Sequence, residues 1–346
     1  MIVTKAADLL IEKIKKDYKD DIAVVVMMGS HLYHETHSKS DLDMYFIPKT
    51  DRGFKLGTVF IIDGIGYDFW PISWDRISKI ASHDERIGSI ITEGKVIYYS
   101  TEEDLDKFNG FKTQALNVSN IGYFTHKAMQ KIENAAMSYL ELGQSTSLSK
   151  TRYHSIKVIY QVTEAISLLN RITIKRGRGK LLNEILSMPI VPNDFEKHYQ
   201  TIFKSRDIDE IKVSIKSIYE GTRQIITETF RQQEQGSFKD AAEGFYEELI
   251  NNYNKIERAY DIGDFQTAMF AASEIDMELN SLLGNRGVDL SHLPDLLEVY
   301  DHQDLKPLLE RSKTHQKALV QLLMDHGVQI RILKDEHELQ AYLDQL

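Results

Sequence analysis

Two aspartates separated by one residue, Asp41 and Asp43, carry the clearest chemical signal in the sequence. They stand at the start of the largely apolar run Leu42–Ile47, which predicts a strand. Side chains alternate along a strand, so residues two apart share a face. Two neighbouring carboxylates repel each other and need a cation between them. The pair therefore predicts a site for Mg²⁺, which takes its remaining ligands from water and substrate phosphates.

A short segment before this pair predicts a phosphate-binding element. Gly29 and Ser30 follow the continuous apolar run Ile22–Met28, which is typical of a buried strand. Gly29 is expected to open a helix whose first N–H groups bind an anion, and the Ser30 hydroxyl is expected to donate a further hydrogen bond. Lys39 and Ser40, which directly precede the pair, are included among the predicted nucleotide-binding residues.

A third carboxylate is expected on a neighbouring strand, and Asp68 in the run Tyr67–Ile72 is well placed. An aspartate among aromatic and apolar neighbours is costly unless it is paired or binds a metal. The alternative is an aspartate bound to backbone at a strand edge. Asp63 is a rival third acid, although its Asp-Gly context is typical of a hairpin turn.

The surrounding pattern predicts an α+β chain with a sheet first and helices after it. An amphipathic helix is expected over 3–18, and further strands over Thr58–Ile62 and Val96–Tyr99. Long helices are predicted from their apolar spacing over 117–143, 150–175, 207–232, 240–260 and 264–283. The expected domains are a catalytic domain at 1–108, a helical bundle closing the cleft at 109–235, and a further helical region at 236–346.

These motifs together resemble the DNA polymerase beta-like nucleotidyltransferase superfamily, and within it the bacterial kanamycin and aminoglycoside nucleotidyltransferases. Besides Gly29-Ser30, the aspartate pair and Asp68, the segment Glu93–Tyr99 is similar to the close of that catalytic domain, and Leu182–Leu186 is similar to its helical regions. The specific match covers about residues 20–100. The sequence departs from the family at His34, where many relatives carry a glycine.

The resemblance implies a reaction and its cofactors. Asp41, Asp43 and Asp68 would hold two Mg²⁺ ions. ATP or another nucleoside triphosphate would give a nucleoside monophosphate, with AMP preferred, to a hydroxyl of a small acceptor, with release of pyrophosphate. The acceptor would be aminoglycoside-like, as for antibiotic-resistance enzymes. The alternatives are AMP transfer to a protein, as in some toxin–antitoxin systems, and a non-catalytic nucleotide sensor, which His34 in the phosphate loop favours.

The resemblance also implies a general base supplied by the helical region. Glu164 is the predicted base, because it lies in the middle of a largely apolar helix where a carboxylate needs a function. A solvated helix face, or pairing with Lys157, would also explain Glu164. Glu133 is a weaker candidate.

Two weaker signals remain open. His31, His34 and His37 are spaced three apart, but a polar loop edge explains them better than zinc does, since no fourth ligand is evident. The basic run Lys175–Lys180 is expected either to contact the triphosphate or to be a solvated helix end.

Composition limits the classes of partner and compartment. Acidic residues outnumber basic ones by 52 to 42, giving a formal charge of −10, which disfavours an extended nucleic-acid interface. The absence of cysteine excludes disulfides and thiolate chemistry. No stretch approaches the ~20 apolar residues of a membrane span, and the first residues do not form a secretory signal. We therefore expect a cytoplasmic protein with no membrane partner, and allow for a homodimer.

Overall fold

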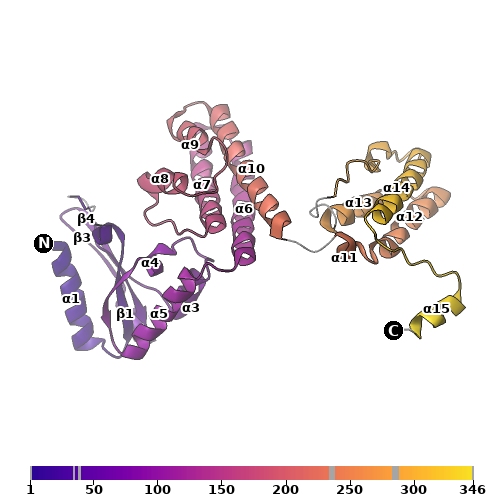
Figure 1. Cartoon of the computed structure of the whole chain (residues 1–346). Helices are drawn as coiled ribbons and strands as arrows, with labels where there is room; N and C mark the ends of the chain where they lie inside the picture. The colour runs from indigo at the N-terminus through magenta and orange to yellow at the C-terminus, as the bar shows by residue number, and fades with distance from the viewer. Residues whose placement is uncertain (1, 34–35, 38–39, 234–237, 283–287, 345–346) are drawn as a thin grey trace. The chain divides into compact units, whose positions relative to one another are not determined.

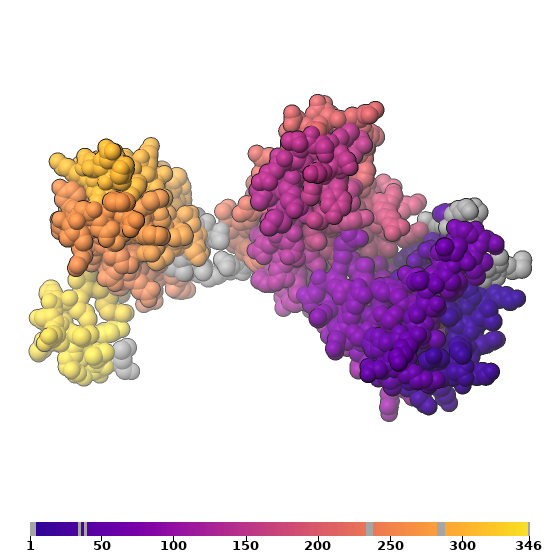
Figure 2. Space-filling view, turned by 180° about the vertical axis from the view of Figure 1, so that it is seen from behind, coloured from indigo at the N-terminus to yellow at the C-terminus, as the bar shows by residue number. Residues whose placement is uncertain are grey.

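The computed structural model describes residues 2–33, 36–37, 40–233, 238–282 and 288–344. The chain separates into two compact units, residues 1–227 and 228–346, which are shown as ribbons in Figure 1 and in space-filling form in Figure 2. The expected domains at 1–108, 109–235 and 236–346 stay predictions. Within the described ranges, no helix combines the length and apolar character that a membrane span needs.

The strands of the first unit form one five-stranded mixed sheet (Figure 1). In their spatial order they are β3 (Thr58–Ile62), β4 (Ile65–Pro71), β2 (Asp43–Pro48), β1 (Ile22–Met27) and β5 (Lys95–Tyr99). β2 and β4 run parallel, and every other neighbouring pair is antiparallel. The sheet and the helices that follow it confirm the predicted α+β fold class.

The continuous apolar sequence of β1 reflects burial on both faces of the sheet. Val25 packs in a core with Ile14 of helix α1 (Ile2–Asp17). Val24 and Val26 point into a second core with residues of the helices on the other face. These helices are α3 (Trp74–Ala81), α4 (Ser89–Thr92) and α5 (Glu102–Leu116). A strand covered on both sides has no polar face, so its sequence does not alternate.

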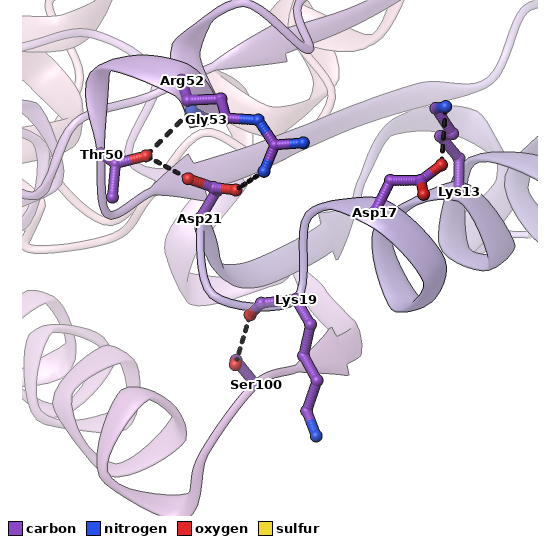
Figure 3. A network of polar contacts seen from close by, with 8 residues as sticks. All are labelled: Lys13, Asp17, Lys19, Asp21, Thr50, Arg52, Gly53 and Ser100. Carbon is purple, nitrogen blue, oxygen red and sulfur yellow. Dashed lines mark hydrogen bonds and ion pairs between the residues drawn. The ribbon is translucent and has the colours of Figure 1, made fainter.

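A network of polar contacts fixes the other end of β1, away from Gly29 (Figure 3). The buried carboxylate of Asp21 accepts hydrogen bonds from the Thr50 hydroxyl (2.5 Å) and from the Arg52 guanidinium (2.7 Å). The Ser100 hydroxyl donates to the carbonyl of Lys19 at 2.8 Å. The network therefore connects the start of β1 to α2 (Asp51–Phe54) and to the segment after β5.

Helices complete the first unit. They are α6 (Ile121–Gln144), α7 (Leu148–Asn170), the short 3₁₀ helix η2 (Arg178–Lys180), α8 (Leu181–Leu186), α9 (Phe195–Lys204) and α10 (Ile208–Gln233), whose last residues belong to the second unit. The prediction of one helix over 150–175 is wrong at its end. Arg171 adopts a left-handed conformation (φ 57°) and donates its N–H to the carbonyls of Leu168 and Ser167, which ends α7 at Asn170. The basic run that follows therefore begins in a loop.

The second unit is helical. Its elements are α11 (Phe238–Ala242), α12 (Phe245–Ile262), α13 (Phe265–Leu282), the 3₁₀ helix η3 (Leu297–Val299), α14 (Lys306–Asp325) and α15 (Glu336–Leu343). Helices α12, α13 and α14 share one apolar core. Inside it, the Tyr253 hydroxyl and His315 Nδ1 are 2.7 Å apart, and burial lowers the pKa of His315 to about 4. His315 is thus a neutral hydrogen-bonding residue of the core at neutral pH.

We predict that Asp21→Ala lowers the free energy of unfolding of the first unit by about 2 kcal/mol, because it leaves the Thr50 hydroxyl and Arg52 without their buried acceptor. Both tryptophans, Trp70 and Trp74, lie in this unit, so their fluorescence during urea denaturation of the full chain reports on it. Lys13→Ala is the control. It breaks an exposed ion pair with Asp17 in the same region and should leave the midpoint nearly unchanged. Equal midpoints for both variants would contradict the role of Asp21.

Candidate active site

A cleft of about 850 Å³ opens at the carboxyl-terminal end of β1. Gly29, Ser30 and Asp41, from the connection between β1 and β2, line it together with Asp43 at the start of β2. The tip of the hairpin between β3 and β4 contributes Gly64 to Gly66. The segment after α7, which is distant in sequence from the strands, contributes three cationic residues, Lys175, Arg176 and Arg178. Segments more than 130 residues apart therefore form one cleft.

Glycine at position 29 makes room for the carboxylate of Asp43. The Met28 N–H donates to the Asp43 carbonyl at 2.9 Å, which extends the pairing of β1 with β2 beyond the strand ends. Gly29 has φ 77°, and a Cβ atom there would lie 1.9 Å from Oδ2 of Asp43. Any side chain would displace that carboxylate. Ser30 follows in the predicted short helix, here a 3₁₀ helix η1 (Gly29–Tyr33), and lines the cleft.

The three predicted aspartates come from neighbouring parts of the sheet. Asp43 is the first residue of β2 and is the register partner of Asp68 in the parallel strand β4. Asp41 precedes the strand, so alternation along β2 does not position it, although it lines the same cleft. Asp68 is exposed between the buried residues Tyr67 and Phe69, and it is not among the residues that line the cleft. Asp68 thus lies inside a strand among apolar and aromatic neighbours, as expected, but its side chain is on the exposed face of β4.

Desolvation and the repulsion of neighbouring carboxylates raise the pKa of Asp43 and Asp68. Burial raises the pKa of Asp43 most, and the charges of Asp41 and Asp68 raise it further. Arg178 and His31 act in the opposite direction on Asp43. The pKa of the largely exposed Asp68 is also raised, by partial desolvation against its neighbours and then by the charge of Asp41. The site thus concentrates negative charge where a cation would be favourable.

No group of three or more histidine, aspartate or glutamate side chains is placed to hold a metal ion within the residues that the structure describes. This holds for the aspartates and for the histidines considered for zinc, of which His34 lies outside the described residues. The Nε2 atom of His31 is buried and has no hydrogen-bond partner in the described part of the chain. Protein side chains alone therefore do not form a complete metal cage here.

Ser40 shapes the loop before Asp41. Its hydroxyl accepts the N–H of His37 at 2.9 Å, and its own N–H donates to the His37 carbonyl at 2.9 Å. Ser40 is buried and lines the cleft. Its hydroxyl therefore holds the loop in place through His37 and is also positioned beside a ligand in the cleft. Lys39, the other predicted residue of this loop, lies outside the described residues.

The basic run after α7 faces the acidic residues. Lys175 forms an ion pair with Glu93 (3.2 Å), and the guanidinium of Arg176 lies over the ring of Tyr33 (4.3 Å to its centre). Arg178 is exposed and close enough to Asp43 to oppose the rise in its pKa. Lys175 to Gly177 lie in a loop, and Arg178–Lys180 form the short helix η2. The interpretation as a solvated helix end is wrong for Lys175, Arg176 and Arg178, because these three residues line the cleft.

Glu184, whose function the sequence did not reveal, holds this loop in place. Its carboxylate accepts three consecutive backbone N–H groups, from Lys175 (2.6 Å), Arg176 (2.9 Å) and Gly177 (2.9 Å). Successive N–H groups pointing at one anion form a nest of the kind that normally binds a free anion. The only signal in the sequence was that Glu184 falls in a segment similar to the family's helical regions.

Glu164 lies in a cavity of about 160 Å³ that adjoins the cleft. The two share five lining residues, which are Ile87, Ser89, Lys175, Arg176 and Arg178. Glu164 is buried, and desolvation raises its pKa to about 7 although Lys131 and Arg86 favour its charged form. Lys157 instead lies 4.0 Å from Glu141, so the proposed pairing with Glu164 is wrong.

The two rival acids lie elsewhere. Asp63 occupies a two-residue hairpin turn with Gly64, and both have positive φ (52° and 72°), as its Asp-Gly sequence predicts. Glu133 is exposed on α6 and lines neither the cleft nor the cavity of Glu164. Of the two glutamates, Glu164 and Glu133, the geometry therefore favours Glu164, which lines a cavity that adjoins the cleft.

We predict that Glu164 makes the first unit less stable as pH rises from about 4.5 to 7. A raised pKa means that the folded protein keeps a proton that the unfolded chain has lost, so stability present at low pH is lost through this window. The loss amounts to roughly 3 kcal/mol at most. The urea midpoints, measured by tryptophan fluorescence, should be nearly equal for wild type and Glu164→Gln at pH 4.5. At pH 8 the midpoint of the variant should be the higher of the two. Parallel pH profiles would contradict the burial of this carboxyl.

Comparison with known proteins identifies no family. No protein-family model matches the sequence, and no curated protein matches it. Among solved structures, the chain is similar to a nucleotidyltransferase-like protein from Exiguobacterium sibiricum 255-15, with 11% sequence identity and a TM-score of 0.34. The similarity covers 66% of this chain and 81% of that chain. A likeness this distant does not indicate what the present chain binds or catalyses.

Proposed function

We propose that the protein is a nucleotidyltransferase that moves a nucleoside monophosphate, with AMP the favoured one, from a nucleoside triphosphate to a hydroxyl group of a small acceptor. One observation carries the proposal. The carboxylates of Asp41 and Asp43 share a cleft with Gly29 and Ser30 and with a loop of three cationic residues. A cleft with an acidic and a basic side fits a metal-bound triphosphate, which presents cations to one side and phosphate oxygens to the other.

The acidic side fits magnesium that arrives with the nucleotide. Mg²⁺ is usually bound by one or two carboxylates together with water and substrate phosphates, so a complete protein cage is not required. Asp41, Asp43 and Asp68 would hold the two ions that the family resemblance implies. When bound, these ions would neutralise the triphosphate and stabilise the entering and leaving oxygens. The crowding that raises the pKa of Asp43 would be relieved by the same charge.

The basic side binds the phosphate oxygens. Arg178 is the cationic residue of the loop that acts electrostatically on Asp43, so it lies between the carboxylates and the adjoining cavity. Lys175 and Arg176 add positive charge on the same wall. Ser30 donates its hydroxyl from the opposite wall, and Gly29 keeps the Asp43 carboxylate in its place. These groups position the triphosphate, which supplies most of the rate in phosphoryl chemistry.

Glu164 accepts the proton of the acceptor hydroxyl. The acceptor oxygen forms a bond to the α-phosphorus, the bond from the α-phosphorus to the bridging oxygen breaks, and pyrophosphate leaves. The proton released from the hydroxyl passes to the Glu164 carboxylate. A carboxyl with a pKa of about 7 is well matched to this role, because it is partly ionised at neutral pH and still basic.

We predict that the full chain releases pyrophosphate from one of the four nucleoside triphosphates in the presence of Mg²⁺ and a hydroxylated acceptor. The double variant Asp41→Asn, Asp43→Asn should release it at least about 100-fold more slowly, because it loses several kcal/mol of charge stabilisation. Asp63→Asn is the matched control, since it removes a nearby carboxylate that does not line the cleft and should keep the wild-type rate.

Each other outcome of this experiment points to a different function. Equal release by the double variant and wild type would exclude the proposed site. Magnesium-dependent nucleotide binding without release would indicate a sensor. Transfer of labelled AMP to a protein, with none to any small acceptor, would indicate protein modification.

We predict that the rate of transfer rises with pH through about 7 in wild type, because Glu164 must be ionised to accept a proton. Glu164→Gln should reduce kcat by about 10²- to 10⁴-fold and abolish this rise. Glu133→Gln, which changes an exposed glutamate of α6, should keep both the rate and the profile. A Glu164→Gln variant with unchanged kcat would show that this carboxyl is only structural.

A further inference from the structure

An apolar pocket of about 470 Å³ lies beside the cavity of Glu164. Helices α7, α8 and α9 supply its walls. Its apolar lining consists mainly of Ile156, Ile159, Leu182, Tyr199 and Phe203. Nothing in the steps assigned to the aspartates, the basic loop or Glu164 uses this pocket.

The pocket adjoins the candidate active site. Tyr160, Arg178 and Leu181 line both the pocket and the cavity of Glu164. Arg178 also lines the cleft that contains Asp43. The Glu164 cavity thus shares lining residues with both the cleft of the aspartates and the apolar pocket, and Arg178 lines all three spaces.

Aromatic surface dominates the far side of the pocket. The rings of Tyr199 and Phe203 are tilted against each other, with centres 4.8 Å apart. Phe203 is 50% exposed even though it is a large apolar residue. A pocket of this size with aromatic and aliphatic walls is typical of a site for a small organic molecule.

The charges near the pocket disfavour a cationic occupant. Arg178 is the charged residue of the pocket lining, and no carboxylate is among the described residues that line it. The nearest carboxyl group along this path is Glu164, which already has Lys131 and Arg86 as electrostatic neighbours. A molecule with several ammonium groups would meet positive charge there without compensation, which is costly in an apolar site.

We propose that this pocket binds the apolar part of the acceptor, and that the acceptor is an uncharged hydroxylated molecule with an aromatic or aliphatic group. This inference rests on the proposed function, since it takes Glu164 as the group that receives the hydroxyl proton. An acceptor seated against Tyr199 and Phe203 extends its hydroxyl through the Glu164 cavity towards the aspartates. The nucleobase fits the pocket less well, because its ring edges need more hydrogen-bonding partners than this lining offers.

Direct titration tests the inference without requiring turnover. The full chain, free of nucleotide and metal, is titrated calorimetrically with 4-nitrophenyl and hexyl β-glucosides as neutral probes and with kanamycin as a polycationic one. We expect both glucosides to bind and kanamycin to bind at least tenfold more weakly. Phe203→Ser should weaken glucoside binding about three- to tenfold, because it removes one aromatic wall. Leu182→Ala, on the adjacent wall, should weaken it as well and provides a second test if Phe203→Ser does not fold.

Phe54→Ser is the matched control. Phe54 has a similar exposure (44%) but lies in α2, and its replacement should leave glucoside binding unchanged. Three outcomes would overturn the inference. They are tighter binding of kanamycin than of the glucosides, absence of binding by both glucosides, and competition between the glucosides and Mg²⁺-ATP. Acceptor-dependent pyrophosphate release without glucoside binding would overturn the inference alone. Glucoside binding that depends on Phe203, without release for any acceptor, would support the pocket and reject the proposed function.

Discussion

The register of three strands is the constraint on which the candidate site depends. β2 pairs antiparallel with β1 and parallel with β4, so the first residue of β2, Asp43, lies beside Asp68 on one side and Met28 on the other. The chain after Met28 must turn immediately over Asp43, and Gly29 is the residue that can do so without displacing the carboxylate. A shift of one residue in either pairing would turn Asp43 to the opposite face. The polar network around Asp21 supports the register from the other end of β1.

Much of the sheet could be predicted because its signals are local. The apolar run of β1, the Asp-Gly turn between β3 and β4 and the spacing of the long helices each depend on neighbouring residues alone. The pairing of Asp43 with Asp68 was expected from the family resemblance, and the strands place them in register. Asp41 was predicted on the strand and instead precedes it, because the pairing of β2 begins at Asp43.

The opposite wall of the cleft could not be predicted, because it depends on contacts between distant segments. Lys175–Lys180 has the composition of a solvated helix end, but α7 ends at Asn170, so the run begins in a loop and ends in the short helix η2. Its path is then fixed by Glu184, which the local pattern does not distinguish from a surface acid. Likewise, the apolar residues of the pocket formed by α7, α8 and α9 have the spacing of ordinary core residues. Sequence periodicity does not tell a filled core from a space that admits a ligand.

The hydrogen bonds of Glu184 have a consequence for how this site could diverge. The carboxylate of Glu184 accepts main-chain N–H groups of the loop, and these three hydrogen bonds do not depend on the side chains at positions 175, 176 and 178. Substitutions there can therefore alter the charge presented to a nucleotide without rebuilding the backbone. Substitutions at these positions would change which ligand the cleft prefers, whereas the hydrogen bonds of Glu184 maintain the path of the backbone. Comparing related sequences at these three positions would therefore follow ligand choice, while the residue at position 184 would follow the fold.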